Sequence, residues 1–165
     1  MKINLSKTKE IVFRRPSPYS HLTPCPLPSV DIVKEHTLLG VAFHDSFKFC
    51  KHVDEILAIC NKRSYLLRQL RDQGMPICKL DIIFNGLIVS KITYALAVWG
   101  GFLPQSDLDR LNSFFSKARR WNICTRALRI EELLEHIDLN FWKHSSAQSL
   151  FTFSPASPTP WNYDP

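Results

Sequence analysis

Seven basic side chains lie on two segments with helical periodicity, and side chains of this kind contact the phosphates of nucleic acids. They are Lys62, Arg63, Arg68 and Arg71 on the first segment, and Lys117, Arg119 and Arg120 on the second. On two neighbouring helices they could form a groove that follows a phosphate backbone. The same spacing fits two amphipathic helices with solvated basic faces. The formal net charge of +6 favours a polyanionic partner, nucleic acid or an anionic membrane, but does not separate these interpretations.

Aromatic residues in the same segments have two possible uses. Aromatic rings can stack on nucleic-acid bases, but aromatics at helical spacing more often belong to the core. This choice applies to Tyr65, Phe114, Phe115 and Trp121. Tyr94 and Trp99 lie in the most apolar segment of the chain, so we expect them in the core.

Catalytic and metal-binding patterns are few. The sequence has no phosphate-binding loop, zinc-protease motif or nucleophile elbow, and no near-paired aspartates for a two-metal phosphoryl-transfer site. Cys50 and His52 have no second ligand pair at suitable spacing, so no metal site is expected. The five dispersed cysteines fit reduced thiols in an intracellular protein, cytoplasmic or nuclear. The lysine-rich N-terminus lacks an apolar signal-peptide core. Alone, the chain does not look like a complete enzyme.

The elements that must position these residues are mainly helical. Residues 36–53 predict a β-hairpin with a polar turn at His44–Asp45–Ser46, and residues 11–13 predict a short strand. Proline-rich runs before and after the apolar region predict loops or linkers. Hydrophobic periodicity, capping residues and glycines predict helices over residues 51–71, 77–99, 104–121 and 130–137. Ser106 or Asp107 is expected to cap the third helix.

Residues 82–100 are apolar enough to suggest a membrane span. Lys91 at the centre of this stretch and Asn85 argue against insertion, because a central lysine costs about 2.5–3.5 kcal/mol on insertion scales. We therefore expect a buried central helix and no membrane partner.

Five segments in order resemble the end of reverse transcriptases encoded by non-LTR, jockey-like retrotransposons. They are "NLSKTKEIVF", "LLGVAF", "FKFCKHV", "RSYLLRQLRDQG" and "LIVSKITYALAVWGGFLPQSDLDRLNSFFSKARRW". Each is weak alone, but their order and spacing over residues 3–121 are specific. The resemblance implies the end of a polymerase palm, a primer-grip hairpin and a helical thumb.

The resemblance also implies roles for single residues. Lys7 matches a family lysine thought to protonate the pyrophosphate leaving group, although a plain surface lysine is the simpler interpretation here. Leu39 and Gly40 match the primer grip, where a glycine permits close backbone approach to the primer. The helices from residue 51 onward match the thumb, which contacts the template–primer duplex of RNA and DNA through its phosphates and minor groove.

The departures from the family are equally informative. The family enzyme uses Mg²⁺ held by carboxylates of earlier palm motifs, one of them an aromatic-x-Asp-Asp turn, and this sequence has no Asp-Asp pair. No cofactor is expected in this chain, and its palm and fingers would belong to a longer polymerase. We expect a palm remnant and hairpin over residues 1–49, a thumb-like bundle of three or four helices over 50–142, and a disordered tail over 143–165. The alternatives are a helical protein-interaction module or a non-functional relic of a truncated element.

Overall fold

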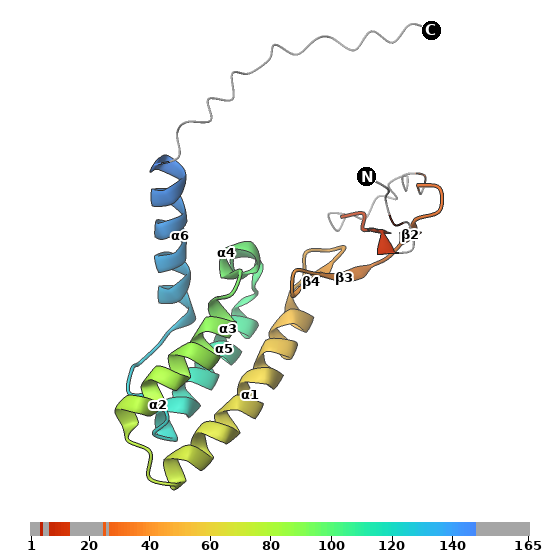
Figure 1. Cartoon of the computed structure of the whole chain (residues 1–165). Helices are drawn as coiled ribbons and strands as arrows, with labels where there is room; N and C mark the ends of the chain where they lie inside the picture. The colour runs from red at the N-terminus through yellow and green to blue at the C-terminus, as the bar shows by residue number, and fades with distance from the viewer. Residues whose placement is uncertain (1–3, 5–6, 14–24, 26, 148–165) are drawn as a thin grey trace, which may run out of the picture.

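The computed structural model describes residues 4, 7–13, 25 and 27–147, with side chains up to residue 139 (Figure 1). The chain is mainly helical with a few short strands, as the sequence predicted. The helices are α1 (Cys50–Asp72), α2 (Ile77–Phe84), η2 (Asn85–Val89), α3 (Ser90–Thr93), α4 (Leu96–Trp99), η3 (Gly100–Phe102), α5 (Gln105–Arg120) and α6 (Ile130–Ala147).

Four short strands precede the helices. β1 (Lys9–Glu10) pairs in parallel with β2 (Asp31–Ile32), and β3 (Glu35–Leu38) pairs antiparallel with β4 (Val41–His44). The strand predicted at residues 11–13 is wrong, since pairing ends at Glu10. Most of the first proline-rich run and the tail from residue 148 lie outside the described residues.

The hairpin is present, but its predicted turn at His44–Asp45–Ser46 is wrong. The turn lies at Leu39 and Gly40, where both residues have positive φ, 49° and 80°. Two central residues of this kind form the tight turn whose twist matches a β-hairpin. A leucine rarely adopts this conformation, which is why its sequence gave no turn signal. His44–Asp45–Ser46 instead ends β4 and leads into α1.

The predicted helix over residues 77–99 is broken into several pieces. It widens into a π-helical turn at η2 and stops at Tyr94, and Ala95 has a left-handed φ of 52°. The Trp99 indole N–H donates to the Tyr94 carbonyl oxygen over 3.1 Å, which fixes the break. The Tyr94 hydroxyl donates to the Leu39 carbonyl oxygen over 2.9 Å. The break therefore serves to hold the tip of the hairpin.

The sequence predicted a buried central helix here, but this broken segment is buried on one face only. Leu80, Phe84, Ile88 and Ile92 are buried on one face, whereas Ile82 on the other face is 66% exposed. In the described part of the chain, Ile77–Phe102 is long and apolar enough for a membrane span, a test that core helices also pass. Its buried face packs against α1 (Figure 1).

His52 on α1 joins the hairpin to the bundle. Its side chain is buried, its Nδ1 accepts a hydrogen bond from the Ala42 N–H over 3.4 Å, and its ring meets Trp99 edge-on at 5.1 Å. Burial and the nearby positive charge of Lys91 lower the pKa of His52, while Glu55 acts weakly in the opposite direction. The neutral imidazole is thus the form that fits this position.

Polar contacts connect the remaining helices. Arg110 on α5 bonds Asp54 on α1 and also the buried Asp107 over 2.9 Å. Neither Ser106 nor Asp107 caps α5, because the helix begins at Gln105 after Pro104. The Asn112 side chain accepts from the Ile130 N–H over 3.0 Å at the start of α6.

α6 is longer than predicted. It continues beyond residue 137 to Ala147, so residues 143–147 are helical although the sequence placed them in a tail. Figure 1 shows α6 beside α4, on the other side of the bundle from α1. α4 and α6 pack at Gly100, which is buried against Leu134.

Candidate nucleic-acid interface

The arginines of α1 are engaged within the fold. The Arg68 guanidinium lies 5.1 Å from the centre of the Trp121 ring, a cation–π contact. Arg71 donates to the Trp121 carbonyl oxygen and to the Asp72 carboxylate, the latter over 2.7 Å. These two arginines fasten the end of α5 to α1, so their charges are partly committed before any ligand arrives.

Arg63 and Lys62 differ although they are adjacent. Arg63 is half-buried and donates to the Leu87 carbonyl oxygen, which lies in the π-helical turn. Such a turn displaces carbonyls from the usual helical ladder, and Arg63 satisfies one of them. Lys62 is exposed and has no ion pair or hydrogen bond within the described residues. Among the predicted α1 cations, Lys62 is therefore the most available to an external phosphate.

The cations of α5 are free of such ties. Lys117, Arg119 and Arg120 are all exposed, and none forms an ion pair or hydrogen bond with another described residue. Helix geometry sends Lys117 and Arg120 to one face and Arg119 to another. The C-terminal turn of α5 thus presents three accessible charges.

Lys117 and Arg120 share a hollow of about 470 Å³ with Arg129. Arg129 is exposed and lies 3.5 Å from Glu131. Hydroxyl groups also line the hollow, together with one opposing carboxylate; the remaining residues are Asp109, Asn112, Ser113 and Ser116. Three cations beside serine hydroxyls form a set of donors suited to a phosphate group.

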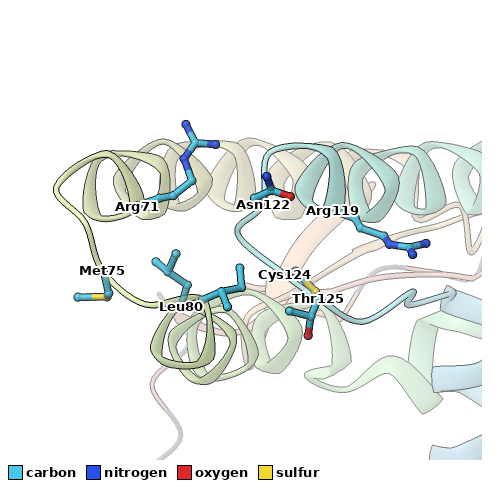
Figure 2. A pocket seen from close by; sticks show the side chains of 8 residues that line it. Arg71, Met75, Leu80, Arg119, Asn122, Cys124 and Thr125 are labelled. Atoms are coloured by element: carbon cyan, nitrogen blue, oxygen red, sulfur yellow. The ribbon is translucent and has the colours of Figure 1, made fainter.

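A second hollow of about 570 Å³ lies where α1, α2 and the loop after α5 meet. Arg71 and Arg119, one from each predicted set, line it together with apolar side chains. Figure 2 shows Leu80 directed into this hollow and the two guanidinium groups directed away from each other. Beside this hollow, the Asp81 carboxylate on α2 accepts from the Thr125 N–H over 2.8 Å and so connects α2 to the loop after α5. The two arginines border one hollow without forming a single anion clamp.

The residues singled out by the family resemblance lie in the segment that precedes α1. Leu39 is 81% exposed at the hairpin tip, and Gly40 faces the Tyr94 ring. Lys7 is exposed, whereas its neighbour Lys9 is paired with Asp31 over 2.5 Å. The hairpin leads into the start of α1, whereas Lys117 shares a hollow with Leu57 and Asn61, roughly 10–16 Å further along that helix at 1.5 Å per residue.

Sequence reasoning missed Arg129, Ser113 and Ser116. Arg129 directly precedes the start of α6, and a basic residue there carries no helical pattern that connects it to α5. Composition could not decide which aromatic residues lie in the core and which are exposed. Tyr65 is 59% exposed, whereas Phe114 and Phe115 are buried. The prediction that Tyr94 and Trp99 lie in the core is correct for Trp99 and wrong for Tyr94, which is 49% exposed because its hydroxyl reaches out to the hairpin tip.

Nucleophilic and metal chemistry find little support in the described residues. Burial raises the pKa of the Cys60 thiol to about 11, which keeps it protonated at neutral pH. Cys50 is exposed while His52 points into the core, so the two do not converge. In the part of the chain that the structure describes, no three His, Cys, Asp or Glu side chains group as metal ligands. Among the described residues, no set of carboxylates fits the Mg²⁺ of the resembled polymerases.

Comparisons with protein-family models, with curated proteins and with solved structures found no match for this chain. The function proposed below therefore rests on the geometry of the described residues and on the sequence resemblance.

Proposed function

We propose that this chain is a thumb-like part of a reverse transcriptase from a non-LTR retrotransposon and binds the RNA–DNA template–primer duplex without sequence preference. The observation that carries the proposal is the accessible cation cluster of Lys117, Arg120 and Arg129 beside two serine hydroxyls. Donors of this type contact phosphates and carry no base information. Sequence-tolerant binding is what a polymerase thumb requires.

The position of the cluster supports the same reading. The hairpin with Leu39 and Gly40 precedes α1, and Lys117 lies beside the middle of α1, near Leu57 and Asn61. A duplex lying along the bundle could meet both. In this proposal the hairpin approaches the primer end, and the cluster holds phosphates further along the duplex.

Cations in the last turn of a helix also stabilise that helix by complementing its dipole. This role explains part of the charge of α5 without any ligand. It does not account for Arg129, which precedes α6 at the positive end of that helix. Glu131, 3.5 Å away, offsets part of its charge, and the exposed guanidinium of Arg129 still brings a third cation to the hollow from another element.

The proposal is tested by the salt dependence of binding to a fluorescent RNA–DNA hybrid, measured by anisotropy. Three phosphate contacts give a slope of log K against log salt of about −2.7, using the value for duplex DNA. Binding should then weaken about 40-fold between 50 and 200 mM salt. Replacing Lys117, Arg120 and Arg129 with glutamine should weaken binding at low salt and make the slope shallower by about three.

Lys79→Gln is the matched control, because Lys79 is an exposed lysine on α2 and lines none of the hollows described above. It should leave nearly all the salt dependence unchanged. An unaltered slope in the triple variant would refute the proposed interface.

A second candidate is a helical protein-interaction module. The observation that favours it is the exposed apolar surface of α1 and α2, where Leu66 is 59% exposed and Ile82 is 66% exposed. Exposed side chains of this size often mark interaction sites when they form a continuous patch. Self-association that is insensitive to salt, seen by sedimentation, would support this candidate over duplex binding.

The proposal does not include polymerase activity for this chain alone. The resembled enzymes need a carboxylate pair, and the sequence has no Asp-Asp. Purified protein should therefore incorporate no deoxynucleotide on a primed RNA template. Incorporation that survives repeated purification and the Lys7→Ala change would contradict this expectation.

A further inference from the structure

Five phenylalanine rings form a continuous row where the N-terminal segment meets the bundle. Phe13 stacks on Phe47 at 4.3 Å, and Phe47 stacks on Phe102 at 5.6 Å. Phe102 contacts Phe49 at 5.9 Å, and Phe49 contacts Phe43 at 5.7 Å. These residues come from the end of the β1 segment, from β4, from the β4–α1 connection and from η3. Tertiary structure, not local sequence, assembles the row.

The row has a buried end and an exposed end. Phe49 is 1% exposed and anchors the row in the core. Phe13, Phe47 and Phe102 are 44%, 40% and 56% exposed, so the two outer rings of this stack are more accessible than the middle one. Exposed aromatic surface of this extent is not needed to fill the core.

The three exposed rings are nearly parallel. The interplanar angle is 25° between Phe13 and Phe47 and 23° between Phe47 and Phe102. Phe47 holds its place through a backbone with a positive φ of 53°, and its N–H donates to the His44 carbonyl oxygen over 2.9 Å. Such a conformation is costly for a bulky residue, and costly conformations concentrate at functional positions.

We infer that Phe13, Phe47 and Phe102 form a platform on which an unpaired nucleobase of single-stranded nucleic acid stacks. A nearly parallel stack presents a flat π face at its end, and every base has a complementary π face. Lys48, between Phe47 and Phe49 in the chain, is exposed and has no ion pair within the described residues, so it is available to a phosphate. The carboxylate of Asp45, the nearest acid in sequence, lies 2.7 Å from Nδ1 of His44. The occupant is thus a base attached to an anionic backbone.

This site is distinct from the phosphate interface proposed above. It lies at the hairpin end of α1, shares no residue with the hollow lined by Lys117, Arg120 and Arg129, and needs no duplex. Single-stranded binding can therefore be measured separately from hybrid binding. Stacking releases no counterions, so loss of a ring should leave the salt slope unchanged. Loss of a phosphate contact should make that slope shallower.

The test uses the full chain and a single-stranded DNA oligonucleotide of mixed sequence containing 2-aminopurine, whose fluorescence is quenched by stacking. Wild-type protein should quench the probe. Phe102→Leu, which keeps an apolar side chain but removes the ring, should abolish most of the quenching and weaken binding about 5- to 150-fold. The salt slope should match that of the wild type. Leu87→Ala removes an exposed apolar side chain from η2, away from the rings, and should change neither quenching nor affinity.

Phe102→Trp separates loss of the ring from disturbance of the fold, because it retains an aromatic face. It should quench the probe at least as well as the wild type. The inference is overturned if wild-type protein does not quench, if Phe102→Leu behaves like the wild type, or if Phe102→Trp fails together with Phe102→Leu. In each of these cases, salt-dependent hybrid binding that is lost in the Lys117, Arg120 and Arg129 variant would leave the proposed function standing.

Discussion

Gly100→Ala should destabilise the chain because α6 packs where a side chain would stand. A Cβ at Gly100 would lie 2.3 Å from Leu134 Cδ2 and 3.1 Å from Leu96 Cδ1. Carbon atoms pack best at about 3.5–4.0 Å, so Leu134 must retreat by more than about 1 Å. Overpacking of this kind costs about 1–3 kcal/mol. Gly100 has an ordinary helical backbone, so alanine there also stabilises the fold by about 0.4–1 kcal/mol, because it lowers the conformational entropy of the unfolded chain.

Subtracting the gain from the cost leaves an expected net loss of about 0–2.6 kcal/mol, with a centre of about 1.3 kcal/mol, which lowers Tm by about 3–5 °C for a chain of this size. Thermal and urea unfolding monitored by circular dichroism would measure it. Gly101→Ala is the matched control, since nothing lies within 4 Å of a Cβ at that position. It should be neutral or slightly stabilising.

A double-mutant cycle identifies the cause of the loss. Leu134→Ala removes the clashing atom, so Gly100→Ala should cost little when introduced into that background. The expected coupling between the two changes exceeds about 1 kcal/mol. If Gly100→Ala is harmless in the wild-type chain, or equally harmful with Leu134 removed, α6 does not pack on α4 as described.

Three further predictions concern the hairpin and the thiols. Because the pKa of His52 is lowered in the folded state, the unfolded chain binds the extra proton first. The free energy of unfolding should therefore be highest above pH 6.5 and decrease as the pH falls below that value. In thermal melts at a series of pH values, His52→Asn should lose less stability at low pH than the wild type. Its amide oxygen can still accept from the Ala42 N–H. Tyr94→Phe should cost about 0.5–1.5 kcal/mol by removing the bond to Leu39, and hydrogen exchange should speed up in the hairpin. Thiol titration of the native chain should give fast reaction at the exposed cysteines and slow reaction at the two buried ones; the exposed cysteines are Cys25, Cys50 and Cys78.

Sequence periodicity predicted the long regular helices well. α1 and α5 carry one apolar stripe each. α1 ends at Asp72, just before Gly74, and α5 begins directly after Pro104. The hairpin was also expected, but its turn was misplaced because Leu39 adopts a positive φ that leucine disfavours. Local preference failed where a distant hydrogen bond from Tyr94 holds the turn.

Tertiary contacts also explain why residues 77–99 do not form one helix. Nothing in the apolar run around Ala95 signals a break, since alanine is the best helix former. The hydrogen bond from Trp99 to the Tyr94 carbonyl and the docking of the hairpin favour the break instead. Similarly, helical spacing predicted that the basic residues of α1 would be free for a ligand. In the fold, Arg68 stacks on the Trp121 ring and Arg71 donates to the Trp121 carbonyl oxygen.

The candidate site could be predicted only in part for the same reason. Lys117 and Arg120 were found because they lie, with Arg119, near the end of one predicted helix. Arg129 was not, because its proximity depends on the turn of the chain between α5 and α6. Charge alone could not show which cations remain free after folding.

The most direct test of duplex binding is a pair of salt titrations of the wild-type chain with two RNA–DNA hybrids of unrelated sequence. Equal affinities for both hybrids, with a log–log salt slope near −3, are expected from about three phosphate contacts. A slope near zero would contradict a phosphate interface. A large preference for one sequence would contradict a thumb-like role.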